Sequence, residues 1–181
     1  MNKSKYDVVV VGAGHAGVEA ALISNFLGVS VAIVTMDINA IARMSCNPAI
    51  GGLAKGQMVR EIDVLGGVMA ETTDFSGLQF KTLNKSKGRA VWSPRAQVDK
   101  RLYEKTIHKK LTNSSVSIIQ SEATAVNIRN NKVEGVLLRS GEEIKCLSLI
   151  VTAGTFLSGV IHIGERKILA GRMGEQRSEG I

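Results

Sequence analysis

A strand-like apolar run that leads into a glycine-rich turn constrains the fold of this chain more than any other feature. Val8–Val11 is continuously apolar, as is typical of a strand buried on both faces of a parallel sheet. Gly12, Gly14 and Gly17 follow with the spacing G-x-G-x-x-G, and the apolar residues after them recur at helical spacing. A second apolar strand is expected over 29–34. The sequence therefore predicts a complete β-α-β unit near its beginning.

The glycines stand where a dinucleotide-binding loop requires them. In such a loop the first glycine permits the tight turn, the second lets the backbone approach a pyrophosphate, and the third lets the helix lie against the strand. The free N–H groups of the helix N-terminus then attract the phosphates. We therefore predict a pyrophosphate-binding loop formed by Gly12, Ala13, Gly14, His15, Ala16 and Gly17.

The second strand departs from the usual dinucleotide-binding pattern. An acidic residue normally ends this strand and holds the adenosine ribose. Here the corresponding position holds Thr35, and Asp37 follows two residues later. We predict that Thr35 contacts the ribose through its hydroxyl group, with Asp37 as the alternative.

The second half of the chain favours FAD over NAD as the dinucleotide. A strand is expected over 116–120, followed by a three-strand antiparallel meander and a separate strand that ends in Thr152-Ala153-Gly154. The expected meander strands are 122–129, 132–139 and 142–147, and the separate strand is 147–151. This order resembles the glutathione-reductase type of FAD-binding domain, an α/β Rossmann-like fold with a parallel sheet and a meander. Cys146 lies in an apolar context and is predicted to be a small core residue.

Residues 38–112 are expected to form a basic, helical insertion between the second and third parallel strands. One helix is predicted over about 53–65 with an apolar face, and a second helix is predicted to start near Pro94. The predicted apolar residues are Met58, Ile62 and Leu65 in the first helix and Val98, Leu102, Ile107 and Leu111 in the second. Residues 81–110 hold ten Lys/Arg against two Asp/Glu. Such a block attracts polyanions, or it is simply a solvated helix face.

Five motifs in order resemble the MnmG (GidA) family of tRNA uridine 5-carboxymethylaminomethyl modification enzymes. They are "GAGHAG", "MSCNPAIGG", "NKSKGRAVWSPRAQVD", "VTAGTFLSGVIHIGE" and "GRMGE". The resemblance covers essentially the whole chain. Because family members are several times longer, it implies an N-terminal fragment of an FAD-binding domain that lacks its closing strand. Arg89 stands where many relatives have proline.

The resemblance implies a flavoenzyme that modifies the wobble uridine of certain tRNAs together with the GTPase MnmE. A methylene group from a folate and an amine from glycine or ammonia are joined to C5 of the pyrimidine, with FAD and NADH for the redox steps. The NADH site is expected outside this chain, and the family forms homodimers. Carried over by motif, Ala123 contributes a backbone contact to FAD and Ser178 contributes another. The tRNA-binding candidates are basic residues of residues 81–110, namely Lys85, Lys87, Arg89, Arg95 and Arg101.

Cys46 is the candidate catalytic residue. Uracil C5 is a poor nucleophile, and addition of a thiolate to C6 would activate it. Cys46 precedes a glycine-rich helix entry with Lys55 close in sequence, and both features lower the pKa of a thiol. An inert cysteine in a loop that packs near the flavin fits the same pattern, so the sequence leaves both interpretations open.

The sequence is also compatible with two other functions, and it predicts a cellular location. The chain alone is predicted to be inactive, as a truncated module that binds FAD or a partner without turnover. A related family of folate- and FAD-dependent tRNA uridine methyltransferases shares the glycine motif, but "SCNPAIGG" and "KGRAVW" argue against it. Two distant cysteines, no signal peptide and no apolar run near the roughly 20 residues of a membrane span predict a soluble, cytoplasmic protein.

Overall fold

The chain forms two compact units in a computed structural model that describes residues 5–44, 47–174 and 177–181. Unit 1 comprises Met1–Ala40 and Ser115–Ile181, and unit 2 comprises Ile41–Ser114. None of the helices in the described part of the chain is both long enough and apolar enough to cross a membrane.

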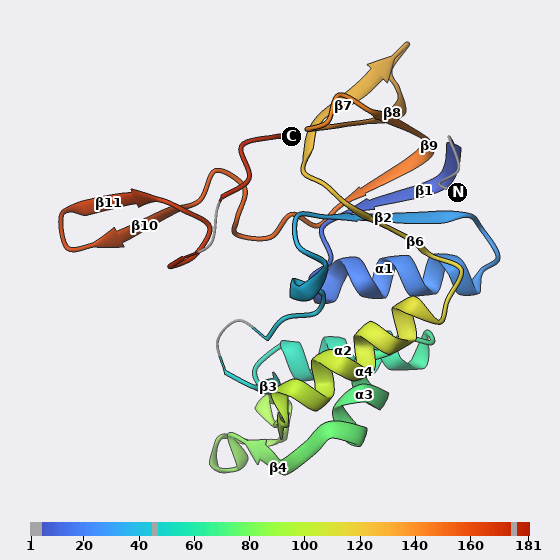
Figure 1. Ribbon diagram of the computed structural model, residues 1–181. Coiled ribbons are helices and arrows are strands. Elements are labelled where there is room, and N and C mark those ends of the chain that lie inside the picture. Colours follow the sequence, from blue (N-terminus) through green and yellow to red (C-terminus); the bar gives the residue numbers. More distant parts are fainter. Residues whose placement is uncertain (1–4, 45–46, 175–176) are drawn as a thin grey trace. The chain divides into compact units, whose positions relative to one another are not determined.

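Unit 1 is built on a mixed six-stranded sheet with the order β6-β2-β1-β9-β8-β7 (Figure 1). The first four strands in this order run parallel, and β8 and β7 continue the sheet as an antiparallel meander. Helix α1 (His15–Phe26) joins β1 to β2, as predicted. The strands are β1 (Lys5–Val11), β2 (Val31–Thr35), β6 (Ser117–Gln120), β7 (Ala123–Arg129), β8 (Lys132–Leu138) and β9 (Glu143–Val151).

The predicted third meander strand and the predicted last parallel strand are one continuous strand, β9. Residues 143–145 pair antiparallel with β8, where Gly135 lies opposite Lys145, and residues 145–151 pair parallel with β1. No turn occurs at Leu147, because a strand can pair along both edges at once. The division at 147 was therefore wrong, while the meander itself is confirmed.

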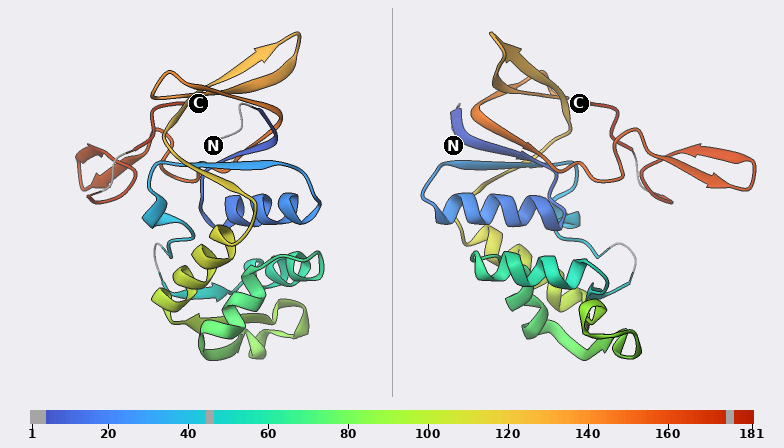
Figure 2. Two further views of the ribbon diagram at one scale, coloured as in Figure 1. Left: turned by 45° about the vertical axis from the view of Figure 1, so that its right-hand side comes forward. Right: turned by 180° about the vertical axis from the view of Figure 1, so that it is seen from behind.

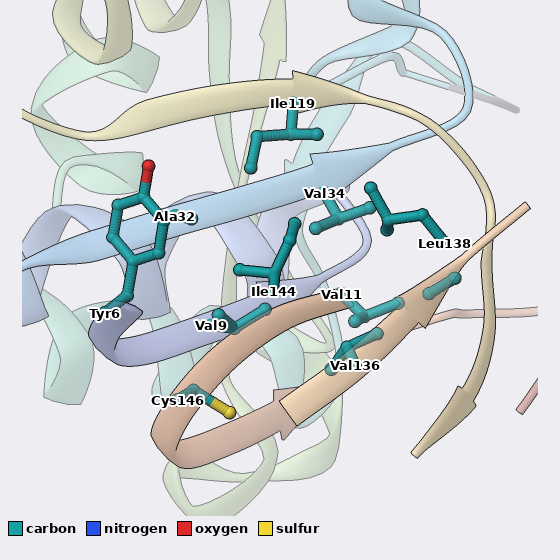
Figure 3. Packing of buried hydrophobic residues seen from close by; sticks show 11 residues of the cluster. Tyr6, Val9, Val11, Ala32, Val34, Ile119, Val136, Leu138, Ile144 and Cys146 are labelled. Carbon is teal, nitrogen blue, oxygen red and sulfur yellow. The ribbon is translucent and has the colours of Figure 1, made fainter. Parts of the chain in front are cut away.

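The core of unit 1 lies between the parallel strands and the meander (Figure 3). Alternate residues of β1 and β2 point into it, and the meander supplies the facing side chains. Cys146 is buried among them, as predicted, and burial raises the pKa of its thiol. The cluster consists of Tyr6, Val9, Val11, Ala32, Val34, Ile119, Ala123, Val136, Leu138, Ile144 and Cys146.

A two-stranded hairpin follows the core of unit 1. It pairs β10 (Val160–Ile163) with β11 (Arg166–Leu169) in antiparallel register. A short 3₁₀ turn, Ile38–Ala40, follows β2.

Unit 2 combines three helices with a three-stranded antiparallel sheet of order β3-β5-β4 (Figure 2). The two expected helices are present, and the sheet and a third helix come in addition to them. The elements are β3 (Ala49–Gly51), α2 (Lys55–Val64), α3 (Met69–Ser76), β4 (Gly77–Leu83), β5 (Ser93–Val98) and α4 (Lys100–Thr112). The tip between β4 and β5 contains two 3₁₀ turns, Lys85–Lys87 and Arg89–Val91.

The predicted helix start near Pro94 was wrong. Pro94 lies in the central strand β5, and its carbonyl accepts a hydrogen bond from Gly52 N–H at 2.8 Å. Helix α4 begins after Asp99, whose carboxylate accepts the N–H of Leu102 at 2.9 Å. An aspartate satisfies a free N–H of the first turn, which a proline ring cannot do.

The predicted apolar faces of both helices also need correction. In α2 the side chain of Met58 is exposed and Leu65 lies beyond the helix, whereas Val59 is buried. In α4 the buried residues are Tyr103, Ile107 and Leu111. Val98 is buried as a residue of β5, and Leu102 is intermediate.

Candidate nucleotide-binding site

The glycine turn at the end of β1 packs so closely against neighbouring backbone that two of its positions have no room for a side chain. Gly12 has φ +100°, and a Cβ there would lie 2.4 Å from the carbonyl oxygen of Thr152. A Cβ on Gly17 would lie 1.8 Å from the carbonyl oxygen of Gly12. Both glycines are therefore required by the packing of α1 and β9 against the turn.

Gly14 differs from its two neighbours because its surroundings are open. It is exposed, has φ −71°, and a Cβ there would meet nothing within 4 Å. It is the N-cap of α1, no side chain caps it, and the first turn carries no acidic residue. An anion can therefore approach this helix end, where backbone N–H groups and the helix dipole favour negative charge. The loop thus fits a pyrophosphate group.

Thr152 holds the glycine turn in place by hydrogen bonds, a role that was not predicted from the sequence. Its N–H donates to the carbonyl of Val11 at 2.7 Å. Its hydroxyl lies 2.9 Å from the carbonyl oxygen of Val11 and 3.0 Å from that of Gly12, and donates to this pair of acceptors. The strand ending in Thr152-Ala153-Gly154 was the sequence signal that could have identified it.

Thr35 ends β2, where the sequence analysis placed the ribose contact. The residue is buried, and its hydroxyl donates to the carbonyl of Asp37 at 3.2 Å. Asp37 in turn accepts the N–H of Asn39 through a carboxylate oxygen at 2.9 Å. The Thr35 oxygen keeps acceptor capacity for a ribose hydroxyl, so the ribose contact stays a prediction.

The two residues carried over as FAD contacts, Ala123 and Ser178, come together through Glu122. This glutamate is 7% exposed and precedes Ala123 at the start of β7. One of its carboxylate oxygens accepts the Ser178 hydroxyl at 3.1 Å and the N–H of Glu179 at 3.0 Å. The other oxygen pairs with Arg139. No sequence motif marks Glu122, because its partners lie up to 57 residues away.

The segment that follows Ser178 packs closely on β7. The N–H of Ile181 donates to the carbonyl of Thr124 at 3.2 Å, and a Cβ on Gly180 would lie 2.1 Å from the carbonyl of Ala123. Ser178 itself is bonded through its N–H to the carbonyl of Phe156 at 3.0 Å. Its carbonyl accepts the N–H of Ser158 at 2.8 Å, so the backbone of Ser178 is held at both its N–H and its carbonyl.

The pKa of Glu122 reflects these contacts. Burial raises the pKa of the carboxyl group, since it disfavours the charged form. The hydrogen bonds from Glu179 N–H and the Ser178 hydroxyl, together with Arg139, outweigh burial and hold the pKa below the usual glutamate value. Glu122 is therefore a charged anchor at neutral pH.

The basic candidates for tRNA contact separate into two places in unit 2. Lys85, Lys87 and Arg89 are exposed at the tip between β4 and β5. Arg95 lies in β5 opposite Lys81, and Arg101 is exposed in the first turn of α4. The structure therefore gathers the first three residues, while Arg95 and Arg101 lie outside the tip.

Cys46 lies outside the described residues, so its predicted role stays a prediction. Lys55, which the sequence analysis placed near it, is the first residue of α2. Burial lowers the pKa of the Lys55 amine.

The parallel sheet, the glycine turn and the meander define a Rossmann-like fold of the glutathione-reductase type, as predicted. The family model described as "Glucose inhibited division protein A" matches residues 7–181, and the chain belongs to this family. The tRNA uridine 5-carboxymethylaminomethyl modification enzyme MnmG of Endomicrobium trichonymphae is 51% identical over 172 residues, which cover 94% of this chain and 29% of that protein. The MnmG of Aquifex aeolicus is 50% identical over 178 residues, covering 98% of this chain and 29% of the relative.

Solved structures agree with this family assignment. A crystal structure of Aquifex aeolicus GidA superimposes with a TM-score of 0.92 at 50% identity, over 98% of this chain and 30% of that chain. The GidA-related protein of Thermus thermophilus shares the fold, with a TM-score of 0.68 at 19% identity over 97% of this chain and 65% of that chain. The chain thus spans about 29% of the length of the curated relatives described here.

Proposed function

We propose that this chain is the N-terminal part of the FAD-binding domain of an enzyme that installs the carboxymethylaminomethyl group on the wobble uridine of tRNA. The observation that carries the proposal is the 50% identity to MnmG over 98% of the chain. The open glycine turn of the structure supports the cofactor, because it fits a pyrophosphate and leaves Gly14 exposed.

FAD would be held by residues along one edge of the parallel sheet. The loop Gly12–Gly17 would bind the pyrophosphate, Thr35 the ribose, and Ala123 and Ser178 would add contacts at the start of β7. FAD, with NADH bound elsewhere in the whole protein, supplies the redox chemistry. Because Ser178 uses its hydroxyl proton toward Glu122, its oxygen would act toward the cofactor as an acceptor.

Cys46 would activate the uracil ring. Its thiolate forms a bond to C6, and the electron pair of the C5–C6 double bond moves to make an enolate at O4. C5 would then attack the folate-derived methylene carbon, carried as an iminium, and the electron pair of its C=N bond would move to the nitrogen. Loss of the C5 proton and departure of the thiolate restore the ring and free the cysteine.

The whole protein would work with the GTPase MnmE as a homodimer in the cytoplasm, with glycine or ammonia as the amine. The names of the relatives support the tRNA uridine modification, and the chain spans about 29% of their length. MnmE, the homodimer, the cytoplasmic location and the amine source rest on the family resemblance. The isolated chain would bind FAD without turnover.

Replacing Cys46 by serine in the full-length protein is expected to abolish tRNA modification while flavin content stays normal, because a hydroxyl is a far weaker nucleophile than a thiolate. The measurement is modified wobble uridine in tRNA incubated with MnmE, GTP, folate, glycine and NADH. Cys146→Ala is the matched control, since Cys146 is a buried core residue of the meander. Normal modification by Cys46→Ser would show that the thiol only packs.

Reversing the charges of Lys85 and Lys87 to glutamate is expected to weaken tRNA binding by the full-length protein at low salt. Each lost phosphate contact should also reduce the slope of log affinity against log salt by about 0.7–0.9. Lys132→Glu with Lys145→Glu is the matched control, because both lysines are exposed in the meander of unit 1. Equal binding by both double variants would make the tip a solvated surface.

A further inference from the structure

We propose that the tip between β4 and β5 binds an unpaired RNA base by stacking it on Trp92. This tip, residues 84–92, is called the β4–β5 tip below. The proposal rests on the proposed tRNA substrate and names how one part of that substrate is recognised. It adds Trp92 to the basic residues, whose charges alone attract any phosphate backbone.

Trp92 is fixed and still accessible. Its indole N–H donates to the carbonyl of Lys85 at 3.3 Å, and its backbone N–H donates to the carbonyl of Arg89 at 3.2 Å. The side chain of Gln57 in α2 donates to the carbonyl of Trp92 at 3.3 Å. Even so, Trp92 is 40% exposed. Its indole is therefore oriented in advance and loses little freedom when a ligand binds.

Internal hydrogen bonds and two residues with positive φ fix the backbone of the β4–β5 tip. Asn84 adopts the left-handed conformation with φ 59°, and its side-chain amide donates to the carbonyl of Val91 at 3.3 Å. Gly88 has φ 93° and separates the two 3₁₀ turns. Other residues would be strained at this φ. Gly88 therefore allows the tight connection between the turn that holds Lys85 and the turn that holds Arg89.

A cation and an aromatic ring meet at the β4–β5 tip. The guanidinium carbon of Arg89 lies 5.9 Å from the centre of the Trp92 ring. Aromatic rings and arginine guanidinium planes are the two surfaces on which proteins stack unpaired bases. Lys85 and Lys87 lie exposed beside them and can neutralise the flanking phosphates.

The charge around the tip favours RNA over a protein partner. No aspartate or glutamate occurs from residue 75 to residue 98, whereas several lysine and arginine side chains in this stretch attract a backbone of one sign. These cations are Lys81, Lys85, Lys87, Arg89 and Arg95. An acidic peptide would satisfy the charges but would leave the exposed indole without a stacking partner.

Trp92 is the single tryptophan of the sequence, so its fluorescence reports directly on the proposed contact. Titration of the 181-residue chain with a short unstructured RNA is expected to quench the tryptophan fluorescence, since a stacked base quenches the indole. The same RNA annealed to its complement, and inorganic polyphosphate, are expected to bind without comparable quenching. An acidic peptide serves as the protein-like probe.

Trp92→Leu is expected to weaken binding of the labelled RNA at least about fivefold, and Trp92→Phe should restore part of the affinity. Binding is followed by the anisotropy of the labelled RNA, and circular dichroism checks folding. Phe75→Leu is the matched control, because Phe75 is an exposed aromatic of unit 2 outside the tip.

Three other outcomes would contradict the stacking proposal. If the RNA binds with unchanged fluorescence and Trp92→Leu binds equally well, stacking is overturned and the phosphate contacts of the proposed function stand. If RNA does not bind, stacking and the tRNA contact both fail. If the acidic peptide alone binds and quenches, the tip is a protein-docking site.

Discussion

Replacing Gly17 by alanine is expected to prevent stable folding of unit 1. The new Cβ would lie 1.8 Å from the carbonyl oxygen of Gly12 and 2.9 Å from its carbonyl carbon, and it would lie 2.7 Å from the Thr152 hydroxyl. Two of these atoms belong to the backbone, so they cannot rotate away. Helix α1 would have to move off the sheet and expose buried residues such as Val18.

The expected loss of stability is about 3 kcal/mol or more, the upper end of the costs of overpacking. Urea unfolding followed by circular dichroism measures it. A folded, equally stable Gly17→Ala protein would contradict the contact between α1 and the glycine turn.

Gly14→Ala is the matched variant, and it separates folding from cofactor binding. Gly14 has an ordinary φ of −71° and open surroundings, so the substitution should cost no more than about 1 kcal/mol, the typical cost of an alanine at an N-cap. Its Cβ would nevertheless occupy the space proposed for the pyrophosphate. Flavin affinity of the full-length protein, measured by titration of the apoprotein, should therefore fall about tenfold, as for one lost hydrogen bond to a charged group.

The β-α-β unit was predictable because its signals are local. Three signals follow one another directly in the sequence: the apolar run of β1, the spacing of the glycines and the helical periodicity of α1. The bounds of β2 came within two residues of the expected 29–34.

Other elements were not predictable, since their partners are distant in sequence. Pro94 indicated a helix start, but the N–H of Gly52 holds it in β5. β9 continues through Leu147, because β1 and β8 pair with its two edges. A single-sequence pattern carries no information about such pairing.

The candidate site likewise contains residues that local motifs predict and residues that only the tertiary structure reveals. The pyrophosphate loop follows from glycine spacing, whereas Thr152 and Glu122 act through tertiary hydrogen bonds. Glu122 has no motif, and its partners Arg139 and Ser178 are 17 and 56 residues away. Trp92 was visible in the sequence, but its pairing with Arg89 required the structure.

Replacing Glu122 by alanine is expected to lower the stability of unit 1 by about 3 kcal/mol at neutral pH, because two hydrogen bonds to a charged group are lost at roughly 1.5 kcal/mol each. The lost partners are the Ser178 hydroxyl and the N–H of Glu179. The Arg139 pair adds little, since the arginine side chain is 66% exposed. Urea unfolding at a series of pH values measures the loss.

The pH dependence of the stability loss tests whether the charged carboxylate of Glu122 causes it. The folded-state pKa of Glu122 is lowered, so its stabilisation is fully present above the unfolded-state pKa of about 4.3 and is lost as pH falls through the lower folded value. The difference between wild type and Glu122→Ala should therefore shrink in acid. Glu122→Gln keeps an oxygen acceptor and should lie between them, whereas Glu134→Gln, an exposed residue of β8, should match wild type. A pH-independent difference would assign the effect to packing, and Ser178 would then be held by its backbone bonds alone.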